Sequence, residues 1–227
     1  MSDVDRNTSQ LSHVLRDDHL SETLITSDEV FAGSFLKVQR DWVNLPQREY
    51  PPQNAAQSDA VANIKATASR EYFKHPGGVM IIPLMEDGTV LVERRYRHPH
   101  RQIFTEFPAG KIDPHEPPAK TAIRELREET GYHAAQIAHI TTIHNAIAYS
   151  DERIELYLAC GLTQGPQSLD EAEFINTAIV STDWLKTELR AHRLSDVKTQ
   201  IGLSWLLSYQ CGEVAWPVFV STAGIEA

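Results

Sequence analysis

Alternating apolar and polar side chains predict two β-strands between residues 23 and 43. In the second strand, Leu36 and Val38 are separated by polar residues, which is the two-residue period of a strand with one buried face. Residues 44–68 break this pattern, because they contain three prolines and many Asn, Gln, Ser and Ala residues. We therefore expect a long loop or insertion there, with at most a short helix over residues 59–65.

Strands then dominate the chain up to a single helix. The run VMIIPL is apolar at every position, as expected for a strand that is buried on both faces. We predict strands over residues 69–74, 78–84, 89–95 and 103–107. A helix is expected to begin at Pro117 and Pro118, where a missing N–H costs nothing, and to end at Gly131. Its apolar face would be formed by Ala119, Ala122, Ile123 and Leu126.

The C-terminal half continues with strands and closes with two helices. Strands are predicted over residues 137–145 and 153–159, and a third strand ends at Val180. Helices are predicted from residue 181 or 182 to about residue 193, and from about residue 196 to residue 209. Strands, a helix, more strands and two helices in this order indicate a mixed α+β fold.

These elements divide the chain into a main domain with an addition at each end. We expect a flexible tail over residues 1–22 and a strand segment over residues 23–72, which carries the insertion at residues 44–68. The main domain is predicted over residues 73–212, and a C-terminal tail over residues 213–227.

Composition narrows the class of protein. The formal net charge of −10 argues against a general nucleic-acid or anionic-membrane binder, since both need a basic surface. Cys160 and Cys211 form neither a disulfide framework nor a zinc-binding spacing. The N-terminus has no signal pattern, and the longest apolar run, Val79 to Met85, is too short to span a bilayer. We therefore expect a soluble, cytoplasmic protein with no nucleic-acid and no membrane partner.

The predicted helix concentrates carboxylates on one face. Glu125, Glu128 and Glu129 are spaced i, i+3 and i+4, and Glu116 lies in the loop that leads into the helix. Like charges at these spacings repel by roughly 0.2–0.5 kcal/mol per pair. A divalent cation would offset this repulsion, because such cations prefer oxygen ligands. A solvated Glu-rich helix with ion pairs such as Arg124–Glu128 is the alternative.

Residues 110–132, GKIDPHEPPAKTAIRELREETGY, resemble the Nudix box, which is the sequence pattern of the Nudix hydrolase family. The fixed positions of the pattern are filled by Gly110, Glu116, Arg124, Glu125, Leu126, Glu128, Glu129 and Gly131. Tyr132 stands at a packing position where the family usually has an aliphatic residue. The resemblance implies an α/β/α sandwich with a mixed sheet over residues 73–212. It also implies hydrolysis of a nucleoside diphosphate that is linked to another group.

The resemblance implies specific roles for the residues of the box. The metal ligands would be Glu125, Glu129, the backbone carbonyl of Ala109, and Glu116, which would orient the group through water. Glu128 would assist catalysis, and Arg124, grouped with it, would pair with a carboxylate rather than touch the substrate. The implied cofactor is Mg²⁺, or Mn²⁺ in its place, with two or more ions bound.

Segments outside the box resemble the ADP-ribose pyrophosphatase group. They are REYFKHPGGV (70–79), RRYR (94–97), EFPAGK (106–111), YSDERIELYLA (149–159) and LDEAEF (169–174). In that group, arginines before the box grip the substrate, so the resemblance assigns Arg70 and Arg97 to phosphate or ribose contacts. It also assigns Glu152 to the terminal ribose and Lys111 to the substrate. A surface ion pair is the alternative role for each arginine, and a solvated turn is the alternative for Glu152.

An acidic loop after the box would supply the remaining chemistry. The segment DEAE, residues 170–173, matches the late loop on which the group places its catalytic base. We assign Glu171 as the candidate general base and Glu173 as an additional metal ligand. An ordinary acidic turn is the alternative interpretation of these residues.

The expected activity is Mg²⁺-dependent hydrolysis of ADP-ribose to AMP and ribose 5-phosphate. Residues 145–149, NAIAY, stand where many ADP-ribose hydrolases have an SPG-like segment. This departure leaves another nucleoside diphosphate sugar, or a dinucleotide, as the first alternative substrate. The second alternative is a non-catalytic nucleotide sensor or partner-binding module, although a pure binder has no need of so many mutually repelling carboxylates.

The N-terminal strands carry an expectation about assembly. Members of the group are typically dimers whose N-terminal strands cross to the partner, and residues 23–72 supply such a segment. Trp42 or Phe31 would then meet the partner or stack on adenine. Packing within the core of their own chain is the alternative for both residues. The resemblance thus implies a homodimer.

Overall fold

The computed structural model describes residues 20–46 and 66–225. The chain divides into two compact units, Met1–Lys74 and His75–Ala227. The possible helix over residues 59–65 lies outside the described residues, as does all but the last three residues of the predicted N-terminal tail.

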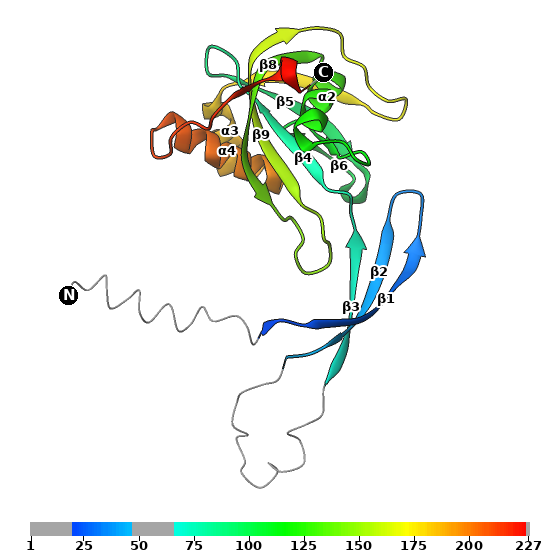
Figure 1. Ribbon diagram of the computed structural model, residues 1–227. Coiled ribbons are helices and arrows are strands. Elements are labelled where there is room, and N and C mark those ends of the chain that lie inside the picture. The colour runs from blue at the N-terminus through cyan, green and yellow to red at the C-terminus, as the bar shows by residue number, and fades with distance from the viewer. Residues whose placement is uncertain (1–19, 47–65, 226–227) are drawn as a thin grey trace, which may run out of the picture. The chain divides into compact units, whose positions relative to one another are not determined.

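The first unit contains an antiparallel sheet of three strands in the order β1-β2-β3 (Figure 1). The strands are β1 (Thr23–Ala32), β2 (Lys37–Asn44) and β3 (Thr67–Lys74). The turn between β1 and β2 is closed by the N–H of Gly33, which donates to the carbonyl of Leu36 at 2.8 Å. β1 and β2 are the two strands that the alternation of side chains predicted between residues 23 and 43.

Much of the apolar surface of this first unit is exposed. All ten residues of β1 are exposed, whereas Val43 of β2 is buried. The exposed large apolar side chains are Leu20, Leu24, Ile25, Val30, Phe31, Phe35, Leu36, Trp42 and Phe73. Phe31 and Trp42 are therefore not enclosed by their own sheet.

The second unit contains two sheets, in the orders β10-β5-β6 and β11-β8-β9-β4-β7. The strands are β4 (Gly78–Pro83), β5 (Val90–Arg97), β6 (Gln102–Glu106), β7 (Ala109–Lys111), β8 (Tyr132–Ile143), β9 (Ile154–Gln164), β10 (Ile175–Val180) and β11 (Val220–Ser221). β4 and β9 run parallel and the other paired strands run antiparallel, so the larger sheet is mixed. Two 3₁₀-helices, η3 (His98–His100) and η4 (Thr222–Gly224), complete the strand regions.

Helices cover both faces of the larger sheet (Figure 1). They are α2 (Pro118–Thr130) on one face, and α3 (Thr182–Arg190) and α4 (Val197–Gln210) on the other. Side chains of β4 alternate between the two faces of the sheet. Val79 and Ile81 pack in the hydrophobic cluster beneath α2, whereas Met80 and Ile82 pack in the hydrophobic cluster beneath α3 and α4. The prediction of a strand buried on both faces is confirmed, and the layers form an α/β/α sandwich.

Side-chain caps begin the last two helices. The hydroxyl of Ser181 accepts from the N–H of Trp184 at 3.1 Å, and the carboxylate of Asp196 accepts from the N–H of Thr199 at 2.9 Å. Both helices start where the sequence predicted them. In the described part of the chain, no helix is long and apolar enough to cross a membrane.

Several boundaries differ from the sequence prediction, and the start of β8 and the C-terminal segment differ most in what they position. β8 begins at Tyr132 rather than at residue 137, because Gly131 adopts a φ of 78° and turns the chain from α2 directly into the strand. The segment predicted as a C-terminal tail, residues 213–227, contains β11, which pairs with β8. The buried hydroxyl of Thr222 donates to the carbonyl of Ala134 at 2.7 Å and holds this segment on the edge of the sheet.

Candidate active site

Helix α2 places its glutamates against β7. Ala122 and Leu126 bury one face of the helix in the core, which leaves the glutamate-bearing side to face β7 and the loops. Gly110 of β7 lies directly against Glu125, because a Cβ placed on Gly110 would be 1.9 Å from the carboxylate carbon of Glu125. A glycine is therefore required at residue 110 for this close approach.

Arg124 neutralises three carboxylates at once. Its Nη2 atom donates to Glu116 at 3.0 Å, and its Nη1 atom donates to Glu125 at 2.9 Å and to Glu128 at 3.0 Å. Its Nη2 atom also donates to the backbone carbonyl of Lys111 at 3.3 Å. Burial lowers the pKa of Arg124, but hydrogen bonding to Glu116 and the charge of Glu125 outweigh burial and raise it above its ordinary value. An arginine of the same helix thus offsets the repulsion between the glutamates.

A second arginine, Arg95 of β5, connects α2 to the acidic loop. Its Nη1 atom donates to Oε1 of Glu129 at 2.6 Å, and its Nη2 atom donates to Glu173. The other oxygen of Glu129 accepts the N–H of Ala109 at 3.0 Å. Glu129 is 2% exposed. Residues from β5, β7 and the acidic loop therefore all converge on the buried end of α2.

Glu93 lies beside this group on β5. Its side chain is 1% exposed and hydrogen-bonded to Glu129, and its Oε1 atom has no partner among the described residues. Burial, and then the charge of Glu129, raise the pKa of Glu93 to about 9, so this carboxyl group is protonated at neutral pH. Burial also raises the pKa of Glu129, although the positive charge of Arg95 opposes the shift.

Arg97, on the same face of β5, is held by a buried carboxylate. Its Nε and Nη2 atoms donate to the two oxygens of Glu106, each at 2.7 Å. Lys198 of α4 donates to Glu106 at 3.0 Å and to Asp196 at 2.7 Å. Burial would raise the pKa of Glu106, but Arg97 and Lys198 outweigh it and lower the pKa to about 2. The guanidinium of Arg97 is thereby fixed in one orientation.

The acidic loop is fastened to the C-terminal end of α2. Three residues that lead into the loop donate hydrogen bonds to backbone carbonyls. The backbone N–H groups of Gly165 and Ser168 donate to the carbonyls of Gly131 and Glu128, and the side-chain amide of Gln167 donates to the carbonyl of Glu129. Glu171 is exposed in this loop, two residues before Glu173. The loop therefore carries the candidate base close in sequence to a carboxylate that Arg95 already holds.

Two residues predicted to bind substrate pair with other side chains. Arg70 belongs to β3 of the first unit, where its Nε atom donates to Glu22 at 3.1 Å. Glu152 lies between β8 and β9, and its Oε1 atom is 3.6 Å from Nδ1 of His75. Neither residue is bonded to the carboxylates of α2, and their substrate roles stay predictions.

Sequence reasoning missed three members of the site, which are Glu93, Arg95 and Glu106. One signal was available, since residues 93 and 95 are charged alternate positions of the strand predicted over residues 89–95 and must share a face. The structure extends this strand to Arg97, which continues the alternation. In the structure β5 and β6 pair so that Glu93 is opposite Glu106. The partners of these side chains come from α2, α4 and the acidic loop, which no local pattern identifies.

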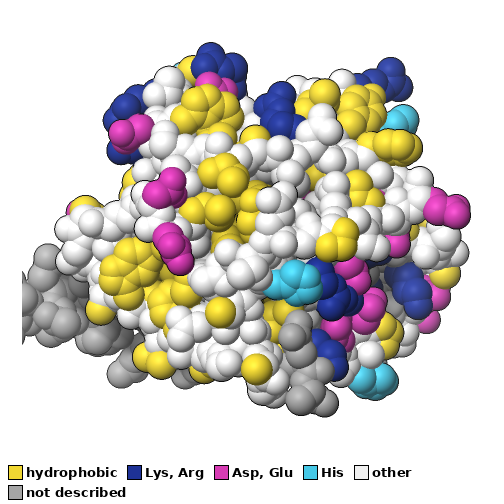
Figure 2. Space-filling view, turned by 90° about the horizontal axis from the view of Figure 1, so that it is seen from above, with side chains coloured by type: hydrophobic (Ala, Val, Ile, Leu, Met, Phe, Trp, Pro, Cys, Tyr) yellow, Lys and Arg dark blue, Asp and Glu magenta, His cyan; other side chains and the backbone are white. Residues whose placement is uncertain are grey.

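The residue types present suit a divalent cation. Glu125, Glu129 and Glu173 supply carboxylate oxygens, and Glu93, whose Oε1 atom has no partner among the described residues, lies beside Glu129. Among residues 20–46 and 66–225, however, no three His, Cys, Asp or Glu side chains are already grouped as a metal site. Two arginines hold these carboxylates instead. On the face in Figure 2, acidic and basic side chains are likewise interspersed.

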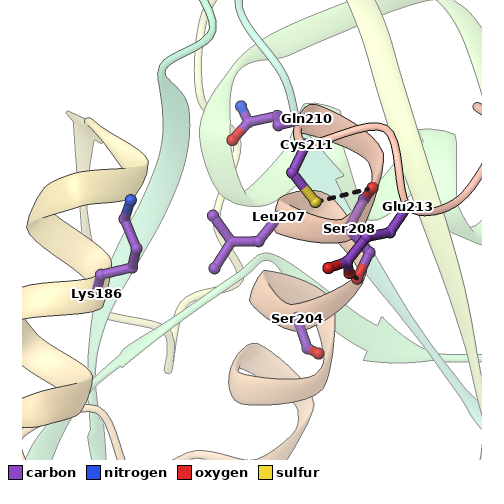
Figure 3. A pocket seen from close by; sticks show the side chains of 7 residues that line it. All are labelled: Lys186, Ser204, Leu207, Ser208, Gln210, Cys211 and Glu213. Carbon is purple, nitrogen blue, oxygen red and sulfur yellow. Dashed lines mark hydrogen bonds between the residues drawn. The ribbon is translucent and has the colours of Figure 1, made fainter.

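A separate open hollow lies between α3 and the end of α4 (Figure 3). Its volume is about 480 Å³, and it is lined by Lys186, Ser204, Leu207, Ser208, Gln210, Cys211 and Glu213. Hydrogen bonds within it join Cys211 and Glu213 to Ser208. None of the carboxylates of α2 lines this hollow, so it is distinct from the candidate active site.

The fold and this helix together define a class of protein. An α/β/α sandwich with a mixed sheet places the box of residues 110–132 on a strand, a loop and a helix, which is the architecture that the Nudix resemblance implied. A crystal structure of an ADP compounds hydrolase superposes with a TM-score of 0.69 over 85% of this chain and 96% of that one. At 18% sequence identity this likeness establishes the fold alone.

Comparison with known sequences then shows the family. The model of the NUDIX domain matches residues 74–199, and the chain belongs to the Nudix family. It is 32% identical over 187 residues to the methanol dehydrogenase activator of Bacillus methanolicus, covering 82% of this chain and 92% of the relative. It is 30% identical over 189 residues to the ADP-ribose pyrophosphatase of Bacillus subtilis, covering 82% and 93%. The protein is thus a Nudix pyrophosphohydrolase similar to the ADP-ribose pyrophosphatase group.

Proposed function

We propose that the protein hydrolyses the diphosphate of ADP-ribose to AMP and ribose 5-phosphate, with Mg²⁺ as cofactor. The observation that carries the proposal is the convergence of Glu129 of the box with Glu173 of the acidic loop on one guanidinium. The relatives named as ADP-ribose pyrophosphatases, from Bacillus subtilis and Mycobacterium tuberculosis, support the choice of substrate. A small nucleotide is therefore the expected partner in solution.

Glu125, Glu129 and Glu173 would hold the cation, with the Ala109 carbonyl and Glu116 assisting. Two or more Mg²⁺ or Mn²⁺ ions are proposed. When bound, such a cation neutralises the diphosphate charge and makes a water molecule more acidic. Glu128 assists these ligands, and Arg124 keeps three of the glutamates in place through its hydrogen bonds.

Glu171 is the proposed general base. It takes a proton from the attacking water, whose oxygen forms a bond to one phosphorus atom while the bond from that phosphorus to the bridging oxygen breaks. The other phosphate leaves with the electron pair of that bond. The loop of Glu171 is fastened to the end of α2 by three hydrogen bonds, which supports a position near the reacting atoms.

Substrate binding is proposed for Arg97, Arg70, Lys111 and Glu152. Arg97 uses its Nε and Nη2 atoms to hold Glu106, which leaves its Nη1 atom for a phosphate oxygen. Arg70 would bind phosphate or ribose, Lys111 a charged group of the substrate, and Glu152 the terminal ribose.

The proposal is tested by incubating the full chain with a panel of diphosphates and Mg²⁺, and separating the products by chromatography. ADP-ribose should yield AMP and ribose 5-phosphate faster than ADP-glucose or a dinucleotide yields its products. Absence of AMP from ADP-ribose would overturn the substrate assignment. Faster hydrolysis of another nucleoside diphosphate sugar or of a dinucleotide would favour that compound as the substrate, the alternative suggested by residues 145–149.

A second candidate is a role as a protein partner, because one relative is named as an activator of methanol dehydrogenase. Under this alternative a nucleotide would bind without being cut. Unchanged nucleotide after long incubation with the Mg²⁺-loaded protein, together with measurable binding, would favour it.

We also propose a homodimer in a reducing, cytoplasmic compartment. The exposed apolar side chains of the first unit, including Phe31 and Trp42, support an interface there. The thiols of Cys160 and Cys211 are free, as is usual in a reducing compartment. Light scattering should give twice the chain mass of 25.5 kDa, and a monomer would contradict the dimer.

A further inference from the structure

The guanidinium of Arg95 lies between two carboxylates from distant parts of the chain. Its Nη1 atom donates to Oε1 of Glu129 at 2.6 Å, and its Nη2 atom donates to Oε1 of Glu173. Arg95 is 18% exposed and Glu129 2% exposed, so water screens this contact little. These are two of the carboxylates that the proposed function assigns to the metal.

A divalent cation and Arg95 would need the same oxygen atoms. Oε1 of Glu129 is occupied by Arg95, and Oε2 accepts the N–H of Ala109 at 3.0 Å. A guanidinium and a metal ion carry like charge, so both cannot stay within bonding distance of one oxygen without repulsion. Two arginines occupy the carboxylate oxygens among the described residues, where no ready group of three acidic or histidine side chains exists.

An internal cation also explains how the site survives without metal. A buried carboxylate that loses its only positive partner is strongly destabilising, because its charge is neither hydrated nor paired. Glu129 has Glu93, Glu125 and Glu173 as acidic neighbours and Arg95 as its close positive partner. Arg95 therefore stabilises the metal-free protein at the same place where a metal would stabilise the loaded protein.

We propose that Arg95 is an internal counter-cation that competes with the divalent metal for Glu129 and Glu173 and thereby sets the metal affinity. The inference rests on the proposed function, since it takes these two carboxylates as metal ligands. Metal binding displaces the guanidinium from both carboxylates, and no covalent bond changes. Arg95 acts here as a positioning residue.

Arg94 provides a matched control. It is the same residue type on the same strand, but its side chain lies on the opposite face, where its Nη1 atom donates to the hydroxyl of Thr105 at 2.7 Å. An effect of total charge or of strand stability would appear equally in Arg94→Gln and Arg95→Gln. An effect of competition would appear only in Arg95→Gln.

The test measures the binding of Mg²⁺ alone, without substrate, to the full chain by isothermal titration calorimetry. The dissociation constant of Arg95→Gln should be at least about tenfold lower than that of the wild type, since metal binding to the wild type must break two charge-assisted hydrogen bonds of Arg95. Arg94→Gln should bind Mg²⁺ like the wild type. In chelator, Arg95→Gln should melt at a lower temperature than the wild type, and it should gain more from added Mg²⁺.

Equal or weaker Mg²⁺ binding by Arg95→Gln would overturn the inference. If Arg95→Gln fails to fold, the wild type still decides: NMR should show faster solvent exchange of the Arg95 guanidinium protons at saturating Mg²⁺, with the signal assigned by Arg95→Lys. Unchanged exchange would contradict displacement. A wild type that binds neither Mg²⁺ nor Mn²⁺ would instead overturn the proposed function, so the two failures are distinguishable.

Discussion

The two arginines of the site hold carboxylates in different ways. Arg124 is 23% exposed, and the carboxylates that it hydrogen-bonds, Glu116, Glu125 and Glu128, all lie within eight residues of it. Arg95 bonds Glu129 and Glu173, which are 34 and 78 residues away. The first network is a property of one helix and its lead-in loop, whereas the second exists only when the domain is folded.

Contacts between buried side chains, such as those of Arg95, should therefore have large effects on stability and metal binding. The contacts of Arg124 within its own helix and lead-in loop should have smaller effects on both. Buried charges lose their hydration and depend on their partners, but exposed ion pairs are screened and contribute little. Substitutions in these two networks, and at Glu106, the buried partner of Arg97, test this difference.

The largest effect is expected from Glu106→Gln. This carboxylate is 3% exposed and binds both Arg97 and Lys198, so its loss removes a buried negative charge that pairs with Lys198 and with the half-buried Arg97. The free energy of unfolding should fall by about 3–5 kcal/mol, measured by urea denaturation. Glu188→Gln, which breaks the exposed pair with Arg193, serves as the control and should leave the urea midpoint unchanged. Equal midpoints for both variants would contradict the distinction.

Acid should weaken the same buried contact. The pKa of Glu106 is lowered from an ordinary value of 4.5 to about 2, so its contribution is complete above pH 4.5 and is lost as pH falls towards 2. The difference corresponds to about 3 kcal/mol. Denaturation across this pH range should show the loss in the wild type and a smaller one in Glu106→Gln. Parallel curves would show that Glu106 does not titrate in this way.

Glu129→Gln should remove activity while the fold persists. It deletes a proposed metal ligand, and Arg95 keeps its bond to Glu173. ADP-ribose turnover should fall at least about 100-fold, because even residues that only support a metal ligand typically contribute 10–100-fold. The circular dichroism spectrum should match that of the wild type. Turnover at the wild-type level would exclude Glu129 from the metal site.

Arg124→Gln should have a smaller effect. Its three carboxylates are partly exposed or held by other contacts, such as the hydroxyl of Thr121 that donates to Glu116 at 2.8 Å. Turnover should fall about tenfold, near the lower limit for residues that orient metal ligands. A loss as large as that of Glu129→Gln, at equal Mg²⁺ saturation, would mean that Arg124 itself contacts the substrate.

The same contrast shows what the sequence could predict. The helix, its end at Gly131 and the positions of its glutamates could be predicted from spacings within residues 110–132. The strand buried on both faces could be predicted from the continuous apolar run at residues 79–84. Gly110 was identified by its place in the box, and the structure adds the reason, which is its contact with Glu125.

Contacts between distant elements could not be predicted in this way. The partners of Arg95 and the neighbours of Glu93 depend on how β5 packs beside α2, and a strand pattern gives the shared face but not what covers it. The pairing of β11 with β8 was missed for the same reason, since two residues of strand carry no detectable period.

The proposed reaction is hydrolysis of ADP-ribose by attack of water on phosphorus. The most direct measurement is a reaction of the wild type with ADP-ribose and Mg²⁺ in ¹⁸O-labelled water, followed by mass spectrometry of the products. Attack of water on phosphorus should give AMP and ribose 5-phosphate, with one ¹⁸O atom in the phosphate of one of them, and no products should form in chelator. Unreacted ADP-ribose, or ¹⁸O bound to ribose carbon instead of phosphorus, would contradict it.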